Sequence, residues 1–181
     1  MLFSKFIPYK IRQKLKIKKA RKMGVHIGVD CWLICTLSAF GTEPYLITIG
    51  NDCTITSGVL FLTHDGGMEV VNHLKGTADD KIAPIRIGNN VFLGNDVKIM
   101  MGVTIGDNVI VGAGSIVTNN VPSNVVIAGV PAKVICSIEE YSTKNHYRMF
   151  PTRNLSSKDK RKFFENKQTY EGGEKPGESS F

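Results

Sequence analysis

His64 is the residue of this chain with the most defined setting for proton transfer. It lies in the segment LTHDGG, and the chain contains only three other histidines. Histidine suits proton transfer near neutral pH, and a carboxylate bonded to its ring would fix the tautomer, as in catalytic triads. Glu43 and Asp65 are the acidic candidates for that role, and His73 is a candidate contact to substrate. The chemistry indicated is removal of a proton from an attacking group; a surface histidine without a role is the alternative.

The element that would position His64 is a six-residue repeat. Leading aliphatic residues recur at every sixth position, and a small or β-branched residue follows each one four positions later. The leading set is Ile87, Leu93, Ile99, Ile105, Val111 and Val117, and the following set is Val91, Val97, Val103, Val109, Ser115 and Val121. Six residues at about 100° each leave any single helix face. The pattern predicts short parallel strands in stacked coils, with three hexads to each triangular turn.

Weaker repeats precede this block, and two segments interrupt them. Phe61 and Ile87 are not separated by a multiple of six, which predicts an inserted loop over residues 62–86 with His64 at its start. Such long loops are usually functional or disordered. A shorter corner loop is expected between Leu37 and Ile49, and it contains Glu43.

The stretch IGNNVFLGNDVKIMMGVTIGDNVIVGAGSIVTNNVPSNVVIAGVPAKVI resembles the hexapeptide-repeat acyltransferases. The resemblance implies an all-β solenoid, a left-handed parallel β-helix with a protruding loop. It further implies a homotrimer in which acetyl-CoA is the cosubstrate, bound between two subunits, with no metal required. The family's catalytic histidine stands at the start of such a loop, and His64 matches it. Segments similar to EPYLI and THDGG occur in polysaccharide and sugar acetyltransferases, so the resemblance also makes Glu43 a site residue.

Contacts to the coenzyme are likewise implied by the resemblance. Positions matching Asn95, Ala113, Thr118 and Lys133 contact acetyl-CoA in the family, where the lysine offers a cation to phosphate. Asn119 is the next cofactor position, and it stands where the family often has lysine. A basic residue is also common where this chain has Cys136. These departures remove two cations from the expected phosphate contacts.

The charge distribution suggests three segments. The first segment, residues 1–24, carries a net charge of +9 and is expected to form a basic helix. The second, residues 25–138, is the expected β-helix and carries −4. The third, residues 139–181, carries +2 and is expected to be a partly disordered extension with a short helix from Ser157 to Gln168. The mildly acidic core argues against nucleic-acid binding. The basic helix either caps the open end of the solenoid or touches an anionic membrane.

Composition and thiol content favour a cytoplasmic protein. The chain has no run of about 18 apolar residues and no signal-peptide pattern at its N-terminus. Its four cysteines fit reduced thiols, two of them at inward positions of the repeat.

The function expected from these features is acetyl-CoA-dependent O-acetylation of a sugar hydroxyl in surface-polysaccharide biosynthesis. Three alternatives remain: N-acetylation of an amino sugar, a γ-type carbonic anhydrase, and a non-catalytic scaffold. The carbonic anhydrase requires three histidines that converge on zinc across a subunit boundary. Here only His64 and His73 lie near each other in the sequence.

Overall fold

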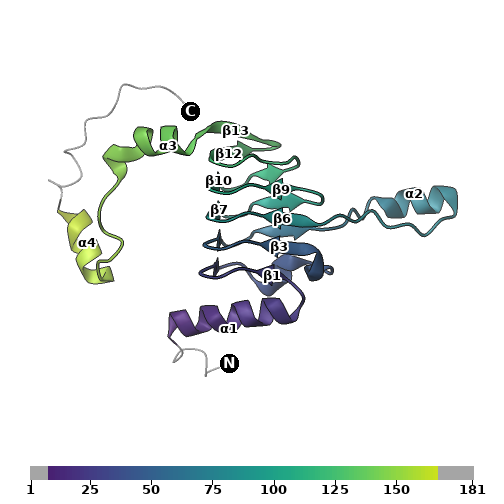
Figure 1. Ribbon diagram of the computed structural model, residues 1–181, viewed down its shortest axis with the longest axis horizontal. Coiled ribbons are helices and arrows are strands. Elements are labelled where there is room, and N and C mark those ends of the chain that lie inside the picture. Colours follow the sequence, from purple (N-terminus) through teal and green to yellow (C-terminus); the bar gives the residue numbers. More distant parts are fainter. Residues whose placement is uncertain (1–7, 167–181) are drawn as a thin grey trace. The chain divides into compact units, whose positions relative to one another are not determined.

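A computed structural model of the chain describes residues 8–166. The described part of the chain divides into two compact units, with the boundary between Ile138 and Glu139. The first unit is a β-helix with helix α1 (Tyr9–Lys22) at its first coil and helix α2 (Met68–Lys75) on a projecting segment (Figure 1). In the described part of the chain, no helix combines the length and the apolar character needed to cross a membrane.

Three parallel sheets form the faces of the β-helix. The first contains β1 (His26–Ile27), β3 (Ile47–Ile49), β6 (Ile85–Ile87) and β9 (Thr104–Ile105). The second contains β2 (Trp32–Leu33), β4 (Thr54–Ile55), β7 (Val91–Leu93), β10 (Val109–Val111), β12 (Val125–Gly129) and β13 (Ala132–Ser137). The third contains β5 (Leu60–Leu62), β8 (Lys98–Met100) and β11 (Ile116–Val117). All pairs are parallel except β12 with β13, which are antiparallel and close the second sheet.

The strand register gives the length of each coil. Phe92 pairs with Ile110, eighteen positions later, which is the turn of three hexads that the repeat predicts. The two coils before it are longer. Ile27 pairs with Ile49, a separation of 22 residues, and Ile49 pairs with Ile87, a separation of 38. Two excursions therefore add four and twenty residues to the regular coil.

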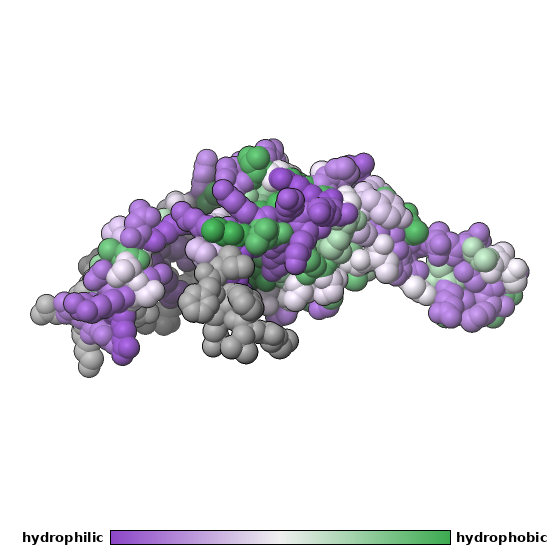
Figure 2. Space-filling view, turned by 90° about the horizontal axis from the view of Figure 1, so that it is seen from below, coloured by the Kyte–Doolittle hydropathy of each residue, from purple (hydrophilic) through white to green (hydrophobic). Residues whose placement is uncertain are grey.

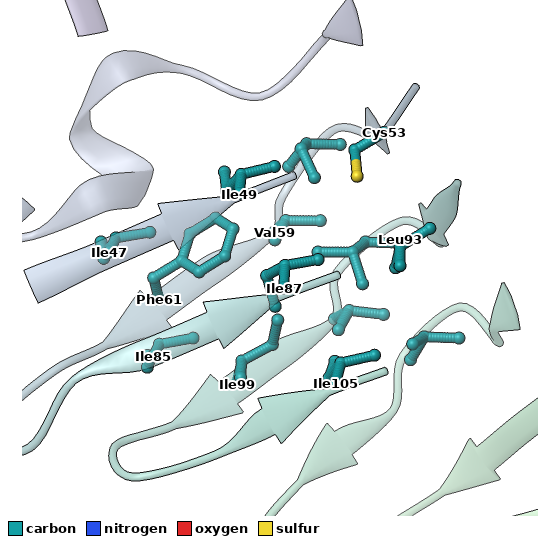
Figure 3. Packing of buried hydrophobic residues seen from close by; sticks show 14 of the residues in the cluster. Ile47, Ile49, Cys53, Val59, Phe61, Ile85, Ile87, Leu93, Ile99 and Ile105 are labelled. Carbon is teal, nitrogen blue, oxygen red and sulfur yellow. The ribbon is translucent and has the colours of Figure 1, made fainter. Parts of the chain in front are cut away.

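Both sets of repeat residues between positions 87 and 121 point inward. Every one of them is buried, from Leu93 at 0% exposure to Val121 at 8%. Figure 3 shows side chains of successive coils meeting in one interior, among them Ile49, Ile87 and Ile105. Complete burial of such an aliphatic side chain stabilises the fold by about 1.5–3 kcal/mol. The stacked interior is therefore what holds the coils in register.

The tight corners depend on residues that tolerate left-handed backbone. Between the first and second sheets, five coils in succession place an Asp or Asn at a φ between +53° and +65°: Asp30, Asp52, Asn90, Asn108 and Asn124. These residue types accept that conformation because their short polar side chains bond locally. The glycine that precedes such a corner is also constrained, since a Cβ on Gly88 would lie 2.6 Å from Asp107 Oδ1.

Helix α1 covers the first coil, where the described part of the chain places no further strand against β1 or β2. Gln13 and Ala20 are buried against this coil, and Ile17 packs on its core. Three side chains of α1 bond to backbone groups there: the Gln13 carbonyl accepts from Leu33 N–H (3.1 Å), Lys16 donates to Ile34 O (3.2 Å), and Arg21 donates to Ile27 O and Gly28 O (both 2.8 Å). The helix thus supplies several of the hydrogen bonds that a neighbouring strand would otherwise make.

Helix α3 (Ile138–Asn145) begins at the last residue of the first unit and continues into the second, which also contains the 3₁₀ turn η4 (His146–Arg148) and α4 (Ser157–Glu165). Ser156 caps α4, because its hydroxyl accepts from the Asp159 N–H at 3.2 Å. The sequence predicts this helix to Gln168, but it ends at Glu165, and Gln168 lies outside the described residues. The expected disordered tail also lies outside them.

Candidate active site

His64 lies at the base of the longer excursion, immediately after β5. Asp65 N–H donates to Lys81 O at 2.9 Å and Ala83 N–H donates to Thr63 O at 3.0 Å, so residues 63–83 leave and rejoin the β-helix as an antiparallel hairpin. His64 itself pairs with Ile82 across this hairpin. The histidine is therefore anchored on one side by a core strand and on the other by a returning strand.

The far end of this hairpin differs from the loop that the sequence predicts. Helix α2 occupies it and ends at Gly76, whose φ of +65° is the left-handed conformation common after helices. None of its residues is buried, and Figure 1 shows it extending away from the coils. A helix of eight residues between polar, glycine-bearing segments is too short for its apolar spacing to stand out in the sequence.

The shorter excursion carries Glu43. It contains two 3₁₀ turns, η2 (Leu37–Phe40) and η3 (Pro44–Leu46). Phe40 is fully buried and stacks on Phe61 of β5 with 5.4 Å between ring centroids. Gly41 then reverses the chain at φ +63° and ψ −153°, a conformation open essentially to glycine alone. The stacked rings fix this excursion against the strand that leads to His64.

Glu43 and His64 meet between the two excursions. His64 Nδ1 lies 2.9 Å from Glu43 Oε2, with the histidine side chain 49% exposed and the glutamate side chain 16% exposed. Two hydroxyls also donate to this carboxylate: Thr42 to Oε1 at 2.6 Å and Thr63 to Oε2 at 2.7 Å. The carboxylate is thus held by three groups, while the outer part of the imidazole remains open to solvent.

The hydrogen bonds of this cluster fix the ionisation of Glu43 and the tautomer of a neutral His64. Hydrogen bonds from Thr42, Thr63 and His64 lower the pKa of Glu43 to about 2. An ionised carboxylate can only accept hydrogen bonds, so the proton of the neutral imidazole must be on Nδ1. Nε2 of His64 then carries a free lone pair. This arrangement can take a proton from a hydroxyl or amine and stabilise the imidazolium that results.

Asp65 has a different partner from Glu43. Its Oδ2 lies 2.9 Å from Lys81 Nζ, and its Oδ1 accepts from the Gly67 N–H at 3.0 Å. The Lys81 ammonium and the Gly67 N–H lower the pKa of Asp65. Of the two acids considered from sequence, the structure therefore brings Glu43 to the imidazole ring. The side chain of Asp65 is paired instead with Lys81 on the returning strand of the hairpin.

His73 lies apart from the Glu43–His64 pair, whereas three residues not expected from the sequence contact Glu43 or Asp65. His73 lies in α2, and no hydrogen bond within the described residues joins it to His64 or Glu43. Thr42, Thr63 and Lys81 hold the two acids, and sequence reasoning did not single them out. The available signal was position alone, since Thr42 and Thr63 directly precede Glu43 and His64 in the chain.

The five residues expected to contact the coenzyme fall on two edges of the β-helix. Asn95 and Ala113 lie at the corner between the second and third sheets, where Asn95 O accepts from Gly114 N–H at 2.7 Å. Lys133 of β13 pairs with Ala128, beside that same corner. Thr118 and Asn119 follow β11 at the opposite edge of the third sheet, joined side chain to side chain at 3.0 Å.

His64 shares an edge with Thr118 and Asn119. It follows β5, and β5, β8 and β11 are successive strands of one parallel sheet. With strands about 4.8 Å apart, His64 lies roughly two strand spacings from Thr118. All five expected coenzyme residues are exposed. Among residues 8–166 of a single chain, no group of three His, Cys, Asp or Glu side chains could hold a metal ion.

Known proteins share this repeat and this fold. Residues 84–119 match the family described as "Hexapeptide repeat of succinyl-transferase". Protein CapG of Staphylococcus aureus is 50% identical over 87% of this chain and 91% of its own length. Galactoside O-acetyltransferase of Escherichia coli K12 is 41% identical over 68% of this chain, which spans 58% of that enzyme.

A solved structure extends the match to three dimensions. The galactoside acetyltransferase in complex with coenzyme A is 31% identical to this chain, with a TM-score of 0.57 and coverage of 76% of both chains. Structures of this kind imply that the coils are left-handed. On the repeat, the fold and these relatives together, the chain belongs to the hexapeptide-repeat acyltransferases.

Proposed function

We propose that this protein transfers an acetyl group from acetyl-CoA to a sugar hydroxyl, with His64 as the general base. The observation that carries the proposal is the Glu43–His64 pair, which leaves a lone pair on the exposed face of an imidazole held by a 2.9 Å contact. The solved relative bound to coenzyme A and the curated galactoside O-acetyltransferase support the donor and the class of acceptor.

The transfer is direct in this proposal. The acceptor oxygen attacks the thioester carbonyl carbon while Nε2 of His64 takes the hydroxyl proton. The tetrahedral intermediate then collapses, the carbon–sulfur bond breaks, and His64 returns the proton to the departing thiolate. The products are an acetyl ester and free coenzyme A. Glu43 stays ionised throughout and stabilises the imidazolium between the two proton transfers.

The donor would bind along the corners that carry Asn95, Ala113, Thr118, Asn119 and Lys133. The small side chain at Ala113 leaves space for the pantetheine arm beside the backbone, and the exposed Lys133 offers a cation to phosphate. Asn119 offers an amide where a lysine would add a second cation.

We propose that the protein is a homotrimer, and the placement of these residues supports a site shared between subunits. Within one chain, strand β8 separates the edge with Asn95 and Ala113 from the edge with His64 and Thr118. In this proposal, one subunit contributes the first edge of the donor groove and a neighbouring subunit contributes the second. Helix α2 supports this arrangement, because Val70 and Leu74 are 63% and 82% exposed in the single chain and a neighbouring subunit would cover them.

We assign the acceptor to surface-polysaccharide biosynthesis and place Asp65 and His73 on the hairpin that would face it. The asparagine that relatives acting on small galactosides use near the first coils is not recognisable in WLICTLS, which argues against a simple galactoside. N-acetylation of an amino sugar uses the same donor site and remains the second candidate.

The four free cysteines fit the cytoplasm, where thiols stay reduced. We place the catalytic domain in residues 25–138.

A thiol-release assay with acetyl-CoA against a panel of sugars, oligosaccharides and amino sugars tests this function. Release of coenzyme A together with an acetyl ester on the product is the expected result. An acetamide product would favour the second candidate. Metal-dependent turnover that a chelator abolishes would favour a zinc site. No release with any acceptor, from a protein that binds acetyl-CoA normally, would contradict both transfer reactions.

A further inference from the structure

Helix α1 uses only one of its faces to cover the first coil. The opposite face carries Ile11 and Leu15, four residues apart and therefore adjacent on the helix surface, which are 49% and 46% exposed. Lys18 and Lys22 continue the same stripe toward the end of the helix. Figure 2 views this end of the first unit and shows hydrophilic side chains over most of it, with hydrophobic ones between them.

Helix α1 carries more positively charged side chains than its contacts with the first coil require. The helix contains eight Lys and Arg residues and no acid. Lys16 and Arg21 bond to backbone carbonyls of the first coil. Within residues 8–166, the side chains of Lys14, Lys18 and Lys22 make no hydrogen bond or ion pair. These cations are available to a negatively charged partner.

A groove runs beside this helix and has both apolar and basic walls. Its volume is about 790 Å³. Lys10, Lys14 and Lys18 line it from α1, and Trp32 lines it from the first coil. Tyr9 stacks on Trp32 with 5.4 Å between ring centroids, and both rings are partly exposed. Amphipathic aromatic rings of this kind favour the boundary between water and the apolar part of a membrane.

We propose that the outer surface of α1 binds the surface of an anionic lipid bilayer. Ile11 and Leu15 enter the interfacial layer, the unpaired lysines contact lipid phosphates, and the groove accepts a headgroup. The exposed apolar pair favours lipid over a nucleic acid, whose backbone offers charge without an apolar layer. Capping of the first coil and contact with a membrane use opposite faces of α1, so one helix can do both.

Co-sedimentation of the full chain with vesicles tests the proposal without any activity measurement. Vesicles of phosphatidylcholine alone are compared with vesicles in which roughly one lipid in three is phosphatidylglycerol. We expect binding to the second only, and weaker binding when salt rises from about 0.1 M to about 0.5 M. Each lysine near the surface should contribute roughly fivefold to the partition coefficient.

Two variants and a matched control separate the contributions. Lys14→Ala/Lys18→Ala/Lys22→Ala should reduce partitioning by about 100-fold. Ile11→Ser/Leu15→Ser should reduce it by about tenfold and leave the remaining binding more salt-sensitive. Lys158→Ala/Lys160→Ala/Lys162→Ala in α4 removes the same charge from another exposed helix and should leave partitioning unchanged. All substituted side chains are exposed, so circular dichroism and thermal unfolding should match the parent.

Three results would overturn the proposal. The first is no binding of the parent protein to the anionic vesicles. The second is an equal loss of binding in the α4 control, which would assign the effect to net charge. The third is binding to single-stranded RNA without binding to vesicles, which would give this surface a nucleic-acid partner.

Discussion

The regular coils and the two excursions of this β-helix obey different rules. Between positions 85 and 117, inward side chains recur every six residues and are buried, and the backbone of each coil pairs with the next. In the longer excursion, α2 buries none of its side chains, and in the shorter one a glycine and two 3₁₀ turns replace a strand. Yet His64 and Glu43 both come from the excursions. The repeat supplies a rigid frame, and the residues that depart from it supply the reactive groups.

The strongest test of this division is His64→Ala. Loss of a general base should lower kcat by about 10²–10⁴-fold with little effect on acetyl-CoA affinity, because the base acts mainly in the transition state. Thermal stability should hold, since the side chain is half exposed. His26→Ala, at an exposed position of β1, is the matched control and should turn over normally. Near-parental activity in His64→Ala would remove this residue from the mechanism.

A substitution in the buried interior of the regular coils should lower stability and leave kcat largely unchanged. Leu93 is fully buried between neighbouring coils, so Leu93→Ala should lower the free energy of unfolding by about 2–5 kcal/mol through lost burial and the cavity left behind. Chemical denaturation would measure it. At temperatures where the variant remains folded, kcat should stay within a few-fold of the parent. A large loss of kcat in a fully folded variant would show that the frame and the site are not separable.

Thr63 lies where the two regions meet, and its substitution should affect pH dependence. Because the pKa of Glu43 falls from 4.5 to about 2 on folding, its carboxylate stabilises the folded state fully above roughly pH 4.5, and that contribution is lost as pH falls through 2. Thr63→Val removes one donor, so the pKa of Glu43 in the folded state should rise. The pH-dependent part of the stability should then be smaller, and its loss should be complete at a higher pH. Thermal unfolding between about pH 2 and 6 would show it, with a cost of about 2 kcal/mol at neutral pH. Identical acid profiles for the two proteins would contradict this role.

The smallest expected effect concerns the donor. Lys133→Ala should weaken coenzyme A binding about tenfold, or 1.4 kcal/mol, if its ammonium meets a phosphate. Asn119→Lys should tighten binding by adding a cation at the other edge. Isothermal calorimetry measures both, and an unchanged affinity in Lys133→Ala would take that residue out of the site.

The same division explains what the sequence could and could not predict. Coil length, inward positions and strand direction follow from the spacing of Ile87, Leu93 and their successors, because a periodic pattern has few ways to bury its apolar side. The contact between Glu43 and His64 does not follow from spacing. It depends on the ring stacking of Phe40 on Phe61 and on the turn at Gly41, which are tertiary features. For the same reason sequence reasoning left open which acid approaches the imidazole.

The hydrogen bonds between α1 and the first coil have a consequence for solubility. A parallel β-helix with a bare terminal coil offers unpaired N–H and C=O groups on which a second molecule could add its own strands, and repeated addition would build a fibril. Gln13, Lys16 and Arg21 occupy several of those groups with side chains that cannot propagate a strand. A chain that lacked α1 would expose a template for end-to-end growth, whereas the intact chain terminates its own sheets.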